Sequence, residues 1–262
     1  MTTAAVFSDD LIACANLVRR GDPDRFMAAM AAPVQARRVL FPLYAMNVEI
    51  ARAPWVTQEP MIAEMRLQWW RDALAEIAGG GPVRPHEVVT PLAGSLPPEL
   101  AAQADEMIAV RRWDIYREPF EDSDHFERYI DASSGTLMWL AVRSLGRAEE
   151  TVVRDYAYAV GLANWFRAIP ELEAHRRVPL LDGTGDGVRR LAEQGLARLA
   201  RARRNRSGVD PEARAGLLAG WQAETILDQT RRTPDRVARG TLGTSEARKR
   251  LSLMLQSATG RW

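Results

Sequence analysis

The chain has 262 residues, of which 47% are apolar, and its 35 basic residues nearly balance its 34 acidic ones. This apolar content is sufficient for a substantial buried core. A net charge near zero argues against nucleic-acid binding through broad phosphate attraction, so we expect no nucleic-acid partner. The single cysteine, Cys14, excludes an internal disulfide and a cysteine-based zinc cluster.

The N-terminal residues carry no basic segment followed by an apolar run, and no uncharged stretch reaches the ~20 residues that a membrane-spanning helix needs. We therefore expect a cytoplasmic protein that is neither exported nor integral to a membrane. Most apolar residues recur at intervals of three or four, which is typical of amphipathic helices packed on one another. The predicted fold class is all-α, as a single domain over residues 1–262 with residues 1–8 flexible.

Prolines, glycines and capping residues divide the chain into predicted helices. A glycine run at 79–81 begins a long connection to Pro98, and Gly146 and Pro170 are read as breaks. The predicted helices cover residues 9–20, 33–53, 59–79, 98–117, 124–145, 149–169, 187–204, 211–230 and 245–256.

Four segments resemble the squalene/phytoene synthase family. Residues 37–46 (RRVLFPLYAM) are similar to its arginine-rich helix with a Tyr-Ala element, and residues 64–71 (EMRLQWWR) contain its Arg-Leu-x-Trp-Trp element. Residues 129–135 match its Tyr-x-x-x-x-Ala-Gly helix, with Ser134 in place of alanine, and residues 164–167 match its Asn-x-x-Arg. The resemblance is clearest over residues 10–205 and implies an isoprenoid (terpenoid) synthase-like helical bundle.

Active members of this family are expected to bind allylic diphosphates through Mg²⁺ held by two aspartate-rich helices. Mg²⁺ prefers hard oxygen ligands, and aspartates four residues apart lie on one helix face. At the corresponding positions this chain has Ala51 and Trp55 in the first motif. The second motif has Ala168 and Leu172, and Glu171 is the acid that remains there. We therefore predict no catalytic residue, no metal ligand and no cofactor.

The departures from the pattern resemble one divergent branch of the family. Residues 46–51, 166–170 and 175–178 are similar to the branch that contains the mitochondrial assembly factor for respiratory complex I. This resemblance implies a protein partner, either a complex I subunit or an assembly intermediate, and a peripheral contact with the inner membrane.

Several residues of the matching segments are candidates for a pocket or an anion-binding site, because arginine binds phosphate bidentately. Surface ion pairs with Glu49, Glu64 or Asp72 would use the arginines equally well, and buried tyrosines are more often part of a core. The basic run 198–206 could contact anionic lipid, although such runs are usually solvated. The candidates are Arg37, Arg38, Tyr44, Arg66, Tyr129, Asn164 and Arg167.

The leading hypothesis is a non-catalytic assembly or interaction factor. The first alternative is an active prenyltransferase, which would need Glu49, Glu171 and Glu173 to hold Mg²⁺. The second alternative is a carrier that binds a prenyl lipid without chemistry.

Overall fold

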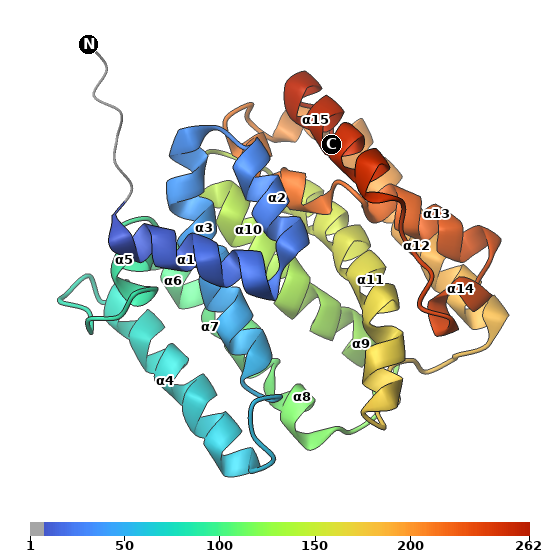
Figure 1. Cartoon of the computed structure of the whole chain (residues 1–262), viewed down its shortest axis with the longest axis horizontal. Coiled ribbons are helices and arrows are strands. Elements are labelled where there is room, and N and C mark those ends of the chain that lie inside the picture. Colours follow the sequence, from blue (N-terminus) through green and yellow to red (C-terminus); the bar gives the residue numbers. More distant parts are fainter. Residues whose placement is uncertain (1–7) are drawn as a thin grey trace.

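The computed structural model describes residues 8–262, which fold into a bundle of helices (Figure 1). These residues contain no β-strand, only an isolated bridge between Ala148 and Val209, so the all-α prediction is confirmed. No described helix is long and apolar enough to span a membrane. The helices are α1 (Asp9–Gly21), α2 (Pro23–Ala31), α3 (Val34–Arg52), α4 (Pro60–Ala78), α5 (Val89–Ala93), α6 (Pro98–Gln103), α7 (Asp105–Ala109), α8 (Arg112–Tyr116), α9 (Ser123–Ile130), α10 (Thr136–Arg143), α11 (Glu150–Ala174), α12 (Gly185–Arg204), α13 (Ala223–Arg232), α14 (Asp235–Ala238) and α15 (Glu246–Thr259).

Side-chain caps fix where several helices begin. Asp22 accepts a hydrogen bond from the Arg25 amide at the start of α2, and Thr184 and Ser245 cap α12 and α15 in the same way. Each cap satisfies an amide that has no partner inside the helix. Ser8 caps α1, whereas the rest of the segment predicted to be flexible, residues 1–7, lies outside the described residues.

Two apolar cores lie on opposite sides of α10, which runs through the middle of the bundle between α3 and α11 (Figure 1). Leu140 of α10 belongs to the core built mainly by α1 to α7, and Val142 belongs to the core built mainly by α9 and α11 to α13. Because successive residues of α10 face different cores, the whole helix is buried apart from Arg143 at its end. This central helix joins the two halves of the chain.

The segments predicted at 98–117 and 211–230 are not single helices. The first is divided into α6, α7 and α8, and α8 ends where Arg117 takes a positive φ of 60°. The second begins as a 3-10 helix, Ala213–Gly220, and continues as α13. Helix α2, at Pro23–Ala31, was not predicted, and α5 lies inside the predicted loop. These short elements depend on tertiary contacts more than on local periodicity.

Pro170 does not end its helix, so the predicted break is wrong. Helix α11 continues through Pro170 to Ala174. Proline removes one hydrogen bond from a helix interior, but Ile169 and Leu172 on either side are both buried. Their packing holds the last turns of α11 in place.

A π-helical turn, Asp131–Gly135, joins α9 to α10. The Ser133 hydroxyl donates a hydrogen bond to the Tyr129 carbonyl at 2.6 Å. A π turn adds a residue to the helix and often occurs at functional sites. Here it brings Ser133 and Ser134 to the wall of a cavity.

The 3-10 helix approaches α10 closely at Gly216. A Cβ atom at this position would lie 2.9 Å from the Val142 amide nitrogen and 3.0 Å from the Ala141 carbonyl carbon. Backbone atoms of a buried helix have little room to move, so only glycine fits here.

We expect Gly216→Ala to lower the free energy of unfolding by about 2 kcal/mol, because the added methyl group overpacks this contact. Gly183→Ala is the matched control, since no atom lies within 4 Å of a Cβ there. Urea denaturation of both variants measures the difference. Equal stability of the two variants would contradict the proposed close approach.

Candidate functional site

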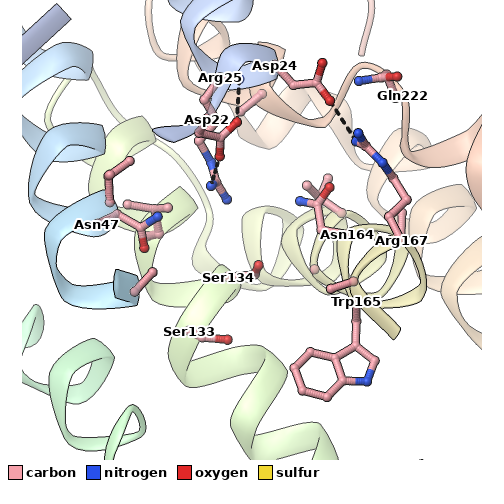
Figure 2. Close-up of a pocket in the computed structure, with 18 of the residues that line it drawn as sticks. Asp22, Asp24, Arg25, Asn47, Ser133, Ser134, Asn164, Trp165, Arg167 and Gln222 are labelled. Atoms are coloured by element: carbon pink, nitrogen blue, oxygen red, sulfur yellow. Dashed lines mark hydrogen bonds and ion pairs between the residues drawn. The ribbon is translucent and has the colours of Figure 1, made fainter. Parts of the chain in front are cut away.

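A cavity of about 870 Å³ opens between the N-terminal helices and α11. Helices α2 and α3 form one side, while the π turn, α11 and the start of α13 form the other (Figure 2). The lining combines apolar side chains such as Leu137, Val160 and Ile226 with carboxamides and hydroxyls. This composition suits a ligand with an apolar body and a polar end.

The positions that the family resemblance assigns to the two aspartate motifs line this cavity from two walls. Helix α3 and the turn after it supply the first set, and α11 supplies the second. Within each helix the spacing of four residues places the side chains on one face, and Trp55 follows in the turn after α3. The motif positions are Ala51 and Trp55 on one wall and Ala168 and Leu172 on the other. One helical turn before each set lies a carboxamide that also lines the cavity, Asn47 on α3 and Asn164 on α11.

None of these six side chains is a carboxylate, and Asn47 and Asn164 are the only ones with oxygen atoms in the side chain. A carboxamide oxygen is a weaker ligand for Mg²⁺ than a carboxylate because it carries no full charge. The two walls therefore carry no carboxylate at these six positions.

The charged groups of the lining compensate one another. Asp24 on α2 accepts a 2.7 Å bond from Arg167 on α11, and Asp22 pairs with Arg25 (Figure 2). Glu246 pairs with Lys249 at 2.8 Å. The lining acids are Asp22, Asp24, Asp114, Glu171 and Glu246, and the lining bases are Arg25, Arg52, Arg111, Arg167 and Lys249.

The pair between Asp24 and Arg167 is partly shielded from solvent, with side-chain exposures of 22% and 34%. Burial would raise the pKa of Asp24, but the hydrogen bond and charge of Arg167, followed by a hydrogen bond from Gln222 and the charge of Lys249, outweigh it and hold that pKa below its usual range. Asp24 is therefore a bound carboxylate that is already committed to an arginine.

A buried polar network lies at one end of the cavity. The Tyr129 hydroxyl donates to both carboxylate oxygens of Asp114 at 3.0 Å, and Arg111 donates to Asp114 at 3.1 Å and to Tyr129 at 2.9 Å. Burial, followed by the charge of Asp114, raises the pKa of Tyr129. Burial opposes the charged form of Arg111, but Tyr129 and Asp114 outweigh this effect and raise its pKa. Tyr129 therefore stays protonated and acts as a hydrogen-bond donor.

Arg177 closes this network from the segment after α11. Its guanidinium donates to the Asp114 carbonyl and lies over the rings of Trp55 and Trp113, at 4.9 Å and 5.4 Å from their centroids. Burial lowers the pKa of Arg177. Trp55, which stands at a motif position, thus packs against an arginine.

Three of the seven candidate residues line the cavity, namely Tyr129, Asn164 and Arg167. Tyr129 is held by hydrogen bonds with Arg111 and Asp114. Arg167 is held by its ion pair with Asp24. Asn164 points into the cavity from α11 (Figure 2).

The other four candidates lie outside the cavity lining. Arg37 donates to the carbonyls of Met30 and Ala32, where it holds the turn between α2 and α3. Arg38 is half-buried on α3, and Arg66 is exposed on α4. Tyr44 is buried, which raises its pKa.

The basic run 198–206 is largely engaged in ion pairs. Arg198 pairs with Glu127, Arg201 with Asp155, and Arg203 with Glu224. These contacts support the reading of the run as a solvated, ion-paired helix face.

Sequence analysis missed several residues that line the cavity. Asn47 could have been found, because it precedes Ala51 by one helical turn on the same face. Asp24, Arg25 and Gln222 come from α2 and from the residue before α13, far from the recognised motifs. No local pattern connects those segments.

The Squalene/phytoene synthase family model matches residues 18–180, which is more than half of the chain. The protein therefore belongs to the squalene/phytoene synthase family. A dehydrosqualene synthase in complex with a ligand has the same fold, with a TM-score of 0.76, 14% identity and 96% coverage of both chains. The squalene synthase HpnC from Alicyclobacillus acidocaldarius gives a TM-score of 0.69 at 18% identity, over 90% of this chain and 95% of its own. The isoprenoid-synthase fold is thereby confirmed.

Among curated proteins, the chain is similar to the NADH dehydrogenase (ubiquinone) complex I, assembly factor 6 homolog of Drosophila melanogaster. The two are 24% identical over 250 residues, covering 84% of this chain and 75% of the fly protein. The human complex I assembly factor 6 is 23% identical over 178 residues, covering 63% of this chain and 51% of its own length. The chain thus spans about half of the human protein. A phytoene synthase of Arthrospira platensis is 23% identical over 180 residues, covering 63% of this chain and 57% of its own.

We expect Arg167→Gln to lower the free energy of unfolding by about 1 kcal/mol at pH 7, as for other partly exposed ion pairs. Because the folded-state pKa of Asp24 is depressed, the pair stabilises the protein above the unfolded-state pKa of about 4. This contribution is lost as the pH falls through the folded-state pKa.

Urea denaturation of the unmodified protein and of Arg167→Gln, between pH 7 and pH 3, measures the difference in their free energies of unfolding. Arg190→Gln is the control, because its ion pair with Asp182 is more exposed. A difference for Arg167→Gln that does not shrink as the pH falls would contradict the assignment to Asp24.

Proposed function

We propose that this protein is a non-catalytic member of its family that acts as an assembly factor for respiratory complex I. The fly and human relatives carry the name of a complex I assembly factor. The observation that carries the proposal is that the aspartate-motif positions on the cavity wall hold Ala51, Trp55, Ala168 and Leu172. The partner is a complex I subunit or assembly intermediate, which the protein meets at the surface of the inner membrane.

The charge balance of the cavity supports the non-catalytic part of the proposal. A prenyl diphosphate bound through Mg²⁺ needs a surplus of carboxylates for the metal. Of the three glutamates that the transferase alternative requires, Glu171 lines the cavity, whereas Glu49 and Glu173 do not belong to its lining. Among residues 8–262, no three His, Cys, Asp or Glu side chains are grouped so that they could hold a metal ion.

A prenyl-lipid carrier is a second candidate function, and the cavity favours it. Its volume suits a chain-like ligand, and its uncharged polar groups, among them Asn47, Asn164 and Ser134, suit a neutral head group. A carrier retains such a ligand without changing it.

We expect the purified protein to show no Mg²⁺-dependent turnover of farnesyl or geranylgeranyl diphosphate beside an active enzyme of the family. The reason is that neither motif supplies the carboxylates for the metal. The Ala51→Asp/Trp55→Asp variant tests whether one restored motif is enough. Product formation by the unmodified protein would refute the non-catalytic assignment, and recovery of a bound prenyl lipid without product would favour the carrier.

We also expect deletion of the gene to reduce the amount of assembled complex I, because an assembly factor acts before the enzyme is complete. Native gel electrophoresis and NADH:quinone oxidoreduction by membranes measure this loss. Complementation with Ala168→Ser, which adds no charge to the lining, should restore assembly as well as the unmodified gene does. Normal complex I levels in the deletion strain would contradict the proposed role.

A further inference from the structure

The outward face of α15 is apolar over its whole length. Leu251, Met254 and Leu255 are exposed by 59%, 67% and 57%. Ala247 and Ala258 are also exposed and lie on the same face, because their spacings of four and three residues from these side chains match the helix repeat. A helix at the periphery of a bundle normally turns a polar face outward. This one carries a stripe of leucine, methionine and alanine.

The opposite side of α15 attaches it firmly to the bundle. Leu253 is buried in the first core, Gln256 donates to the Trp221 carbonyl at 3.1 Å, and Ser257 donates to the Ala31 carbonyl at 2.7 Å. The orientation of the helix is therefore fixed. Its apolar stripe faces outward because the inner contacts are already satisfied.

Basic side chains border this stripe on both flanks. Arg248 and Arg250 are exposed, and no carboxylate of the described residues forms an ion pair with either. The one acid of the helix, Glu246, is bound to Lys249. At the neighbouring turn, Arg37 donates to the carbonyl of Met30, whose side chain is itself exposed. Whatever covers the stripe must therefore carry negative charge around its edge.

The size of the stripe distinguishes between possible occupants. A helix of 14 residues is about 21 Å long and roughly 10 Å wide, much less than the ~800 Å² per partner of a standard protein interface. A second copy of the chain would in addition bring Arg248 and Arg250 toward the same arginines. A bilayer needs no matching groove, and it accepts a few inserted side chains together with a basic border.

We propose that the outer face of α15 binds to the surface of an anionic lipid bilayer. Leu251, Met254 and Leu255 enter the boundary between head groups and acyl chains, and Arg248 and Arg250 bind lipid phosphates. This inference adds a membrane-binding surface to the protein. The role of that surface in complex I assembly rests on the proposed function. Binding to vesicles is a property of the purified chain, so it can fail or succeed independently of complex I assembly.

The test is sedimentation with vesicles of phosphatidylglycerol and phosphatidylcholine. We expect the protein to bind them and to lose affinity in pure phosphatidylcholine, by roughly fivefold for each arginine at the surface. Met254→Glu should lower the partition coefficient by about tenfold or more, because it places a carboxylate in the stripe and beside Arg250. Met65→Glu is the matched control, since Met65 is exposed by 66% on the distant helix α4.

Three results would overturn the proposal. The first is that the unmodified protein does not bind vesicles. The second is that Met254→Glu binds them as tightly as the unmodified protein, and the third is that Met65→Glu loses as much affinity as Met254→Glu. Analytical ultracentrifugation of the same samples adds a further decisive outcome. A dimer that becomes a monomer in Met254→Glu would assign the stripe to a second copy of the chain instead.

Discussion

The ion pair between Arg167 and Asp24 joins two segments that are 143 positions apart in the chain. It fixes α2 against α11, two elements that line the cavity from opposite sides. The same contact occupies a carboxylate that would otherwise be available to a cation. The same ion pair therefore positions the wall of the cavity and removes a potential metal ligand from it.

This arrangement follows a general constraint on buried charge. A carboxylate that leaves water needs a compensating partner, and an arginine provides it through charge and hydrogen bonds together. A metal-dependent synthase satisfies its acids with Mg²⁺, whereas this protein satisfies Asp22, Asp24 and Asp114 with arginines. At the motif position of Trp55, the indole packs on Arg177 rather than leaving an open site. The walls of the cavity thus carry uncharged side chains at the motif positions, and most of their charged groups are bound to one another.

The sequence predicted the broad architecture because helical periodicity and family motifs are local signals. It placed Ala51, Trp55, Ala168 and Leu172 at matching positions, and the structure brings all four to one cavity. It could not predict that Asp24 would bind Arg167, because that contact depends on how distant helices pack. Likewise, Pro170 has a helix-breaking sequence signal, and only the burial of its neighbours overrides it. Arg37 and Arg66 share a residue type with Arg167 but lie on surfaces that do not face the cavity.

The two facing carboxamides, Asn47 and Asn164, have a consequence for regulation. Amides do not ionise, and most acids that share the cavity with them are held by bases. Asn47 and Asn164 therefore contribute hydrogen-bonding groups but no charge to the cavity at any pH. Under the proposed non-catalytic role, occupancy of the cavity would follow the abundance of its ligand.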